Sequence, residues 1–143
     1  MNAVLYPAIL VLVLSFTAPG LAGERDAVPP VTHDATRKEC GECHMAFQPA
    51  LLPPGSWDRL MDNLADHFGE SAELAPELVA DIHAYLTANA GGGDAGVIRI
   101  TEQRWWMRKH RRIRADTWQR PDIGSKINCG ACHADAARGR YED

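Results

Sequence analysis

Four cysteines occur in this chain of 143 residues, and they form two short motifs of the same type. The first is Cys40-Gly-Glu-Cys43-His44 and the second is Cys129-Gly-Ala-Cys132-His133. In each motif two thiols lie three positions apart, and an imidazole directly follows the second thiol. Thiols and imidazoles are metal ligands and nucleophiles, so these motifs are the first place to look for chemistry.

Three common uses of paired cysteines fit the two motifs poorly. A pair of disulfides, which an exported protein would permit, does not require a histidine after each C-x-x-C. The two C-x-x-C pairs of a zinc ribbon usually lie about 15–20 residues apart, whereas 85 residues separate Cys43 from Cys129. A thioredoxin-like redox motif needs one pair within a βαβ pattern, which this sequence lacks.

The C-x-x-C-H motif is the attachment signal of c-type haem. Two thiols at this spacing can add to the two vinyl groups on one edge of a porphyrin, and the histidine can then bind the iron as proximal ligand. The sequence therefore predicts two covalently attached haems c, a first and a second. Their binding residues would be Cys40, Cys43 and His44, and Cys129, Cys132 and His133.

An iron that only transfers electrons needs a second strong axial ligand, for which the other histidines and the methionines are candidates. A helix predicted from Trp57 to Phe68 would place His67 in its apolar stripe, as it would Met61. This favours His67 as ligand of the first iron. On a later predicted helix His83 falls roughly 100° from the apolar stripe and is expected at the surface. His33 lies in a polar N-terminal arm.

For the second iron the candidates are His110 and Met107, which precedes it by three residues on the same predicted helix. His110 lies in the run Arg108-Lys-His-Arg-Arg112, whose cations would lower its pKa and favour the neutral, ligating imidazole. A histidine among arginines can equally be another solvated basic residue. Two imidazoles would give a lower reduction potential than a histidine and a methionine.

Helices must position these residues, and little or no sheet is expected. The pattern predicts a short helix opening at about Lys38 with the first motif, a non-helical Pro-rich loop over 47–54, and helices over 57–68, 76–90 and 105–114. A final short helix would carry the second motif. The domains would be a signal peptide (1–22), a haem domain (23–90), a Gly-rich linker (91–96) and a second haem domain (97–143).

The first 22 residues have the composition of a secretory signal peptide. Residues 3–16 are mostly apolar, Ala18-Pro19-Gly20 follows, and Ala22 is a small residue suited to cleavage. This run is shorter than the membrane-spanning length of about 20 residues. We therefore expect cleavage after Ala22 and a periplasmic protein. An uncleaved membrane anchor is the alternative, because no Lys or Arg precedes the apolar run.

Charge is divided unevenly along the chain. Residues 24–103 carry 5 basic and 14 acidic side chains, whereas residues 104–126 carry 8 basic and 2 acidic ones. The total of −4 is unlike that of a general nucleic-acid binder. The basic segment is either a solvated face or a docking patch for an acidic redox partner.

Residues 39–143 resemble the small bacterial dihaem cytochromes c. Beside the two motifs, the resemblance rests on Leu64-Ala-Asp-His-Phe-Gly-Glu70, on Trp105, His110 and Trp118, and on the closing Arg138-Gly-Arg-Tyr-Glu-Asp143. It implies a mostly α fold, with an N-terminal domain like a class I cytochrome c and a small, irregular C-terminal haem domain. It also implies bis-histidine ligation at both irons and electron donation to a small oxygen-binding monohaem cytochrome c.

These features together predict an electron-transfer protein and not an enzyme. Its low-potential irons would be bound by His44 and His67 and by His133 and His110. The expected partners are redox proteins, a small monohaem cytochrome c as acceptor and a membrane-bound donor, with no nucleic acid and no small-molecule substrate. The alternative is a small haem enzyme or a gas or redox sensor, which would need one open iron position.

Overall fold

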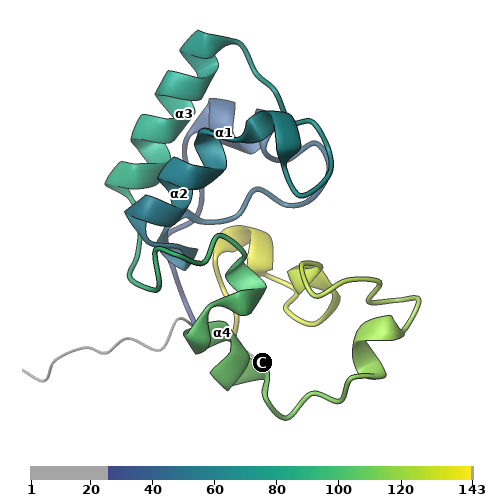
Figure 1. The fold of residues 1–143 in the computed structure, drawn as a ribbon. Coiled ribbons are helices and arrows are strands. Elements are labelled where there is room, and N and C mark those ends of the chain that lie inside the picture. Colours follow the sequence, from purple (N-terminus) through teal and green to yellow (C-terminus); the bar gives the residue numbers. More distant parts are fainter. Residues whose placement is uncertain (1–25, 143) are drawn as a thin grey trace, which may run out of the picture.

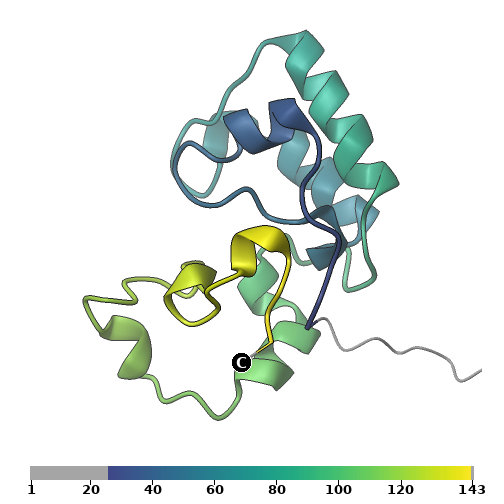
Figure 2. The same cartoon turned by 180° about the vertical axis from the view of Figure 1, so that it is seen from behind.

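The computed structural model describes residues 26–142, which form two lobes (Figures 1 and 2). The first lobe contains α1 (Asp34–Glu39), α2 (Pro54–Met61) and α3 (Pro76–Ala88), and the second begins with α4 (Arg104–His110). Within the described residues the other regular elements are single 3₁₀ turns and two isolated β-bridges. The predicted mostly α fold is therefore confirmed. No helix within this range is long and apolar enough to cross a membrane.

The first lobe has its own hydrophobic core, in which α3 packs against α2 and α1. Proline at the start of both α2 and α3 presets the helical φ and needs no hydrogen-bond acceptor. On α3, Ile82 and Leu86 lie four positions apart and face α2 with almost no exposure. The buried members of this core are Leu52, Trp57, Leu60, Met61, Ile82 and Leu86.

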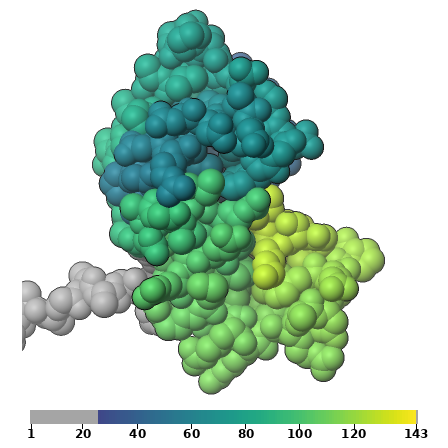
Figure 3. All heavy atoms as spheres, in the orientation of Figure 1, coloured from purple at the N-terminus to yellow at the C-terminus, as the bar shows by residue number. Residues whose placement is uncertain are grey.

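The second lobe is irregular and has few buried apolar residues of its own. After α4 the described chain runs through short 3₁₀ turns, one of which, Cys129–Ala131, carries the second motif. The buried apolar residues in this lobe are Trp106, Ile123 and Ala136. In Figure 3 the C-terminal residues, coloured yellow, lie between the first lobe and the rest of the second lobe.

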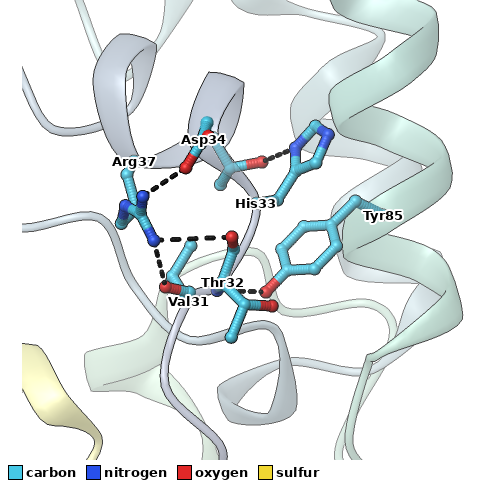
Figure 4. Close-up of polar contacts among 7 residues, drawn as sticks. Val31, Thr32, His33, Asp34, Arg37 and Tyr85 are labelled. Atoms are coloured by element: carbon cyan, nitrogen blue, oxygen red, sulfur yellow. Dashed lines mark hydrogen bonds and ion pairs between the residues drawn. The ribbon is translucent and has the colours of Figure 1, made fainter.

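An extended arm, residues 26–33, joins the two lobes. At one end it pairs with the C-terminal tail, residues 136–142. Val28 N donates to Gly139 O at 2.8 Å, and Tyr141 N donates to Asp26 O at 2.6 Å. At the other end Thr32 N donates to Tyr85 Oη of α3 at 3.0 Å (Figure 4). The arm therefore attaches the tail of the second lobe to the helices of the first.

Several predicted element boundaries are wrong, while the helix predicted from Pro76 is confirmed as α3. The first motif follows α1 instead of opening a helix. The helix predicted over 57–68 begins earlier, at Pro54, and ends at Met61. One 3₁₀ turn, Pro49–Leu51, interrupts the predicted loop, and α4 ends at His110 instead of residue 114. The predicted signal peptide lies outside the described residues.

Candidate functional site

The first motif is placed at the end of α1, against the core of the first lobe. Cys40 is the C-cap residue of α1 and packs against the hydrophobic cluster, whereas Cys43 is exposed. Burial raises the pKa of the Cys40 thiol, and the neighbouring Glu39 carboxylate adds to the rise. Both effects favour the neutral Cys40 thiol over the thiolate.

His44 and His67 face one another. Their ring centres are 6.3 Å apart and the ring planes are inclined at 30°. The Nδ1 of His44 donates to the Met45 carbonyl at 2.9 Å, which leaves Nε2 with its lone pair. Burial, His44 and Arg99 lower the pKa of His67, in that order, and so favour its neutral form.

The separation of these two rings fits one iron bound by both. Two metal–imidazole bonds of about 2 Å, with about 1.1 Å from each nitrogen to its ring centre, separate two ring centres by roughly 6 Å. The Nδ1 of His67 is buried without a hydrogen-bond partner among the described residues. Phe47 lies 4.9 Å from the His44 ring and Phe68 lies 4.8 Å from the His67 ring. Aromatic side chains therefore contact both imidazole rings of the first site.

His67 reaches this position from a turn, and not from the face of a helix as predicted. Local hydrogen bonds end the helix: the Asn63 amide donates to the Asp66 carbonyl at 3.1 Å, and the Asp66 carboxylate accepts from Gly69 N at 2.9 Å. Such side chains compete with helical backbone bonds. Phe68 then adopts a left-handed φ of 60°, which turns the chain back. In the sequence, Asn63 and Asp66 were the available signal that the helix ends before His67.

The second motif opens onto a cavity of about 620 Å³ in the second lobe. This volume is within the usual range for cofactor sites. The cavity is lined by Cys129, Cys132, His133 and His110, by aromatic rings, and by Leu51 and Ile100 from outside the lobe. The aromatic residues are Trp105, Trp106, Trp118 and Tyr141. A large planar apolar group attached through the two cysteines fits such a lining.

His110 and His133 face one another across this cavity. Their ring centres are 6.2 Å apart, close to the spacing at the first motif, but their planes are inclined at 89°. The Nδ1 of His110 donates to the Trp106 carbonyl at 2.9 Å, and the Trp106 ring stacks on the imidazole at 4.0 Å. These two contacts with Trp106, one turn earlier on α4, orient the His110 ring.

The other candidate ligands lie elsewhere. His33 stacks on Tyr85 and pairs with Asp81 at 3.2 Å, and His83 pairs with Asp58 at 2.7 Å. Met107 is 49% exposed on α4, whereas Met61 belongs to the core of the first lobe. The structure thus brings His67 and His110, of all these candidates, opposite the histidines of the two motifs.

Sequence reasoning missed two residues beside the second motif. Tyr141 lies edge-on to the His133 ring at 5.5 Å, and its hydroxyl donates to the Gln48 side chain. Burial raises the pKa of the Tyr141 phenol. Gln48 is fully buried. Nothing in their local sequence signals this contact, because 93 positions separate the two residues.

Comparison with known proteins gives one consistent result. Residues 36–141 match the family described as Dihaem cytochrome c. A crystal structure of DHC purified from Rhodobacter sphaeroides is 42% identical, with a TM-score of 0.71 over 78% of this chain and 98% of that chain. A diheme cytochrome c from the same organism is 40% identical, with a TM-score of 0.71 over 79% and 99% of the two chains.

A third solved structure, the diheme cytochrome type c of Shewanella baltica OS155, is 37% identical, with a TM-score of 0.70 over 76% of this chain and 86% of that chain. No curated protein gives a significant match. The resemblance to the dihaem cytochromes c is confirmed, and the two cysteine pairs carry two covalently attached haems c. The chain belongs to the dihaem cytochrome c family, whose members are haem proteins of electron transfer.

Proposed function

We propose that this protein is a periplasmic electron carrier in which two histidines bind each iron. His44 and His67 would hold the first iron, and His133 and His110 would hold the second. The observation that carries the proposal is the spacing of the two imidazole pairs, 6.3 Å and 6.2 Å, each beside its own cysteine pair. Each pair is separated by the distance that one metal ion bound by both rings requires.

A haem c, when bound, supplies an iron that accepts and returns one electron. His44, His67, His110 and His133 would hold the two irons through neutral imidazoles, and the ligand set would then be the same before and after the transfer. The carbonyls of Met45 and Trp106 fix the tautomers of His44 and His110. Two imidazoles at each iron also favour low reduction potentials. An iron held by two histidines would offer no site to a substrate, which supports a carrier over an enzyme.

The ferric protein should show two low-spin signals in its EPR spectrum. They should differ, because near-perpendicular imidazole planes raise the largest g value, and the planes are inclined at 89° at the second site and 30° at the first. His67→Ala and His110→Ala should each convert one signal to high spin. His83→Ala, His33→Ala and Met107→Ala are matched controls and should leave both unchanged. A near-infrared methionine–iron band, lost in Met107→Ala but kept in His110→Ala, would overturn the assignment.

Carbon monoxide distinguishes a carrier from a haem enzyme or gas sensor. The ferrous protein should not shift its Soret band on addition of the gas, because a histidine occupies each sixth position. His67→Ala and His110→Ala should each bind carbon monoxide at one haem and so serve as positive controls. A rapid shift in the unmodified protein would favour the enzyme or the sensor.

The partners that fit this chain are redox proteins, with a small monohaem cytochrome c as acceptor and a membrane-bound donor. Arg104, Arg108 and Arg111, here named the α4 arginine face, are exposed and form no ion pair with any residue in 26–142. They follow one another at spacings of four and three positions. This face is separate from the cavity lining and would attract an acidic partner to the helix that carries His110.

Export would place the chain in the periplasm, where haem c is attached. Cleavage after Ala22 would leave Gly23 as the first residue. The intact mass of the purified protein should then equal that of residues 23–143 plus two haems. A mass that retains residues 1–22 would instead favour a membrane anchor.

A further inference from the structure

The most deeply buried polar side chain that joins the two lobes is that of Gln48. Its exposure is 0%, and it lies one residue after Phe47, whose ring contacts His44 of the first motif. Its amide Nε2 donates to the Ala136 carbonyl at 2.8 Å, and its Oε1 accepts from the Tyr141 hydroxyl at 2.5 Å. One side chain of the first lobe therefore uses both ends of its amide to bind the second lobe.

The backbone around Gln48 is fixed on the side of the first lobe. Its carbonyl accepts from Leu51 N at 3.0 Å, and the next carbonyl, that of Pro49, accepts from the buried indole of Trp57 at 2.8 Å. Leu51 and Leu52 are 2% and 1% exposed. The backbone that carries Gln48 is therefore held in place by hydrogen bonds and by buried neighbours of the first lobe.

The two residues that Gln48 binds both contact His133, Ala136 at its backbone and Tyr141 at its ring. Ala136 N donates to the His133 carbonyl at 3.0 Å, and the Tyr141 ring lies edge-on to the imidazole at 5.5 Å. Apart from Gln48, the arm also holds the tail, through Tyr141 N and Gly139 O. A displacement of the Gln48 amide would therefore reach the His133 ring through both of its neighbours.

We propose that Gln48 is a positioning residue for electron transfer between the haems, which through Tyr141 and Ala136 sets the orientation of the His133 ring relative to the first motif. The route from His44 through Phe47, Gln48 and Tyr141 to His133 is a continuous series of contacts. The proposal rests on the proposed function, because it requires that His133 binds the second iron. The hydrogen bonds of the Gln48 side chain within residues 26–142 go to Ala136 and Tyr141, which lie outside both motifs.

The test uses Gln48→Leu, which keeps the volume but removes both hydrogen bonds, and Tyr141→Phe, which removes one oxygen atom. Ser56→Ala is the matched control: Ser56 is also 0% exposed and donates to the Val97 carbonyl at 2.8 Å, a residue that belongs to neither motif. The dihaem proteins are compared by ferric EPR, by the redox titration of each haem, and by the rate at which an electron injected at one haem equilibrates with the other.

Both variants should shift the largest g value of the second haem and change the equilibration rate several-fold, with the first haem's signal unchanged. Variants loaded with two haems that keep the spectrum and the rate would overturn the proposal, as would equal changes in Ser56→Ala. If Gln48→Leu fails to accumulate, Tyr141→Phe decides the outcome. The EPR spectrum of the unmodified protein is recorded first, before any variant is made. A second haem that is not low-spin in that spectrum would instead refute the proposed ligation.

Discussion

At the scale of single residues, the pairing of arm and tail depends on a glycine. Gly139 has a φ of +77°, and a Cβ at this position would lie 2.2 Å from the Val28 carbonyl oxygen. That carbonyl belongs to the residue whose N–H donates to Gly139. A side chain here would therefore force apart the two strands of chain that close the second lobe.

Gly139→Ala should destabilise the protein more than Gly124→Ala. Gly124 has a similar φ of +68°, but no atom lies within 4 Å of its added Cβ. The control therefore measures the left-handed backbone alone, a cost of about 1–2 kcal/mol, and the excess in Gly139→Ala measures the collision with Val28. Urea unfolding of both variants checks this. Equal losses of unfolding free energy in the two variants would show that the arm moves away from the added Cβ without a further energetic cost.

At the scale of elements, the packing of α3 on α2 determines the stability of the first lobe. Ile82 is 0% exposed at the centre of this contact. Ile82→Ala should therefore lower the free energy of unfolding by about 2–5 kcal/mol through lost burial and a cavity. Glu77→Ala, an exposed change on the same helix, should alter it by at most about 0.5 kcal/mol. Denaturant unfolding followed at the Soret band tests this, and equal effects would contradict the assigned core.

The α4 arginine face leads to a second prediction at this scale. The rate of electron transfer to an acidic cytochrome should fall as salt rises, because exposed charges are screened over about 8–10 Å at physiological ionic strength. Arg104→Gln and Arg108→Gln should reduce both the rate at low salt and its dependence on salt. Stopped-flow mixing measures both quantities.

Arg114→Gln and Arg120→Gln are the matched controls for this prediction. Each of these arginines already pairs with a nearby carboxylate, Asp116 at 2.7 Å and Asp122 at 2.6 Å. Their removal changes the net charge equally but leaves the α4 arginine face intact. A rate that is flat in salt, or an equal effect of all four substitutions, would refute steering by this face.

Elements differed in how far the sequence could predict them. α3 was predictable because its proline start and its apolar spacing are local signals. The turn that carries His67 was not, since hydrogen bonds of Asn63 and Asp66 override the apolar periodicity that continues past them. The residues nominated for the haems come together in space, but the contact of Gln48 with Tyr141 joins distant segments through a tertiary fold that no periodicity encodes.

At the scale of the whole molecule, the two lobes are stabilised differently. The first has a cluster of six buried residues, all between Leu52 and Leu86. The second, within the described residues, buries few apolar side chains and surrounds a cavity of about 620 Å³. The haem in that cavity therefore supplies much of the apolar volume that a protein core would otherwise provide.

This difference predicts an asymmetric response to the loss of one haem. The full chain with Cys129→Ser and Cys132→Ser should retain the first haem and its low-spin signal, because none of the six buried residues of the first lobe's core lines the second cavity. Its second lobe should become sensitive to protease between α4 and the tail, since neither a haem nor a hydrophobic cluster orders that segment. Intact mass, EPR and limited proteolysis report these three properties.

The reciprocal variant, Cys40→Ser with Cys43→Ser, is the control for that asymmetry. Leu51 and Ile100 line the second cavity, and Gln48 holds the tail, so the second site depends on residues beside the first. Loss of the first haem should therefore disturb the EPR signal of the second, whereas loss of the second should spare the first. Equal effects in both directions, or a Cys129→Ser/Cys132→Ser chain without any low-spin haem, would show that the lobes fold as one unit around both cofactors.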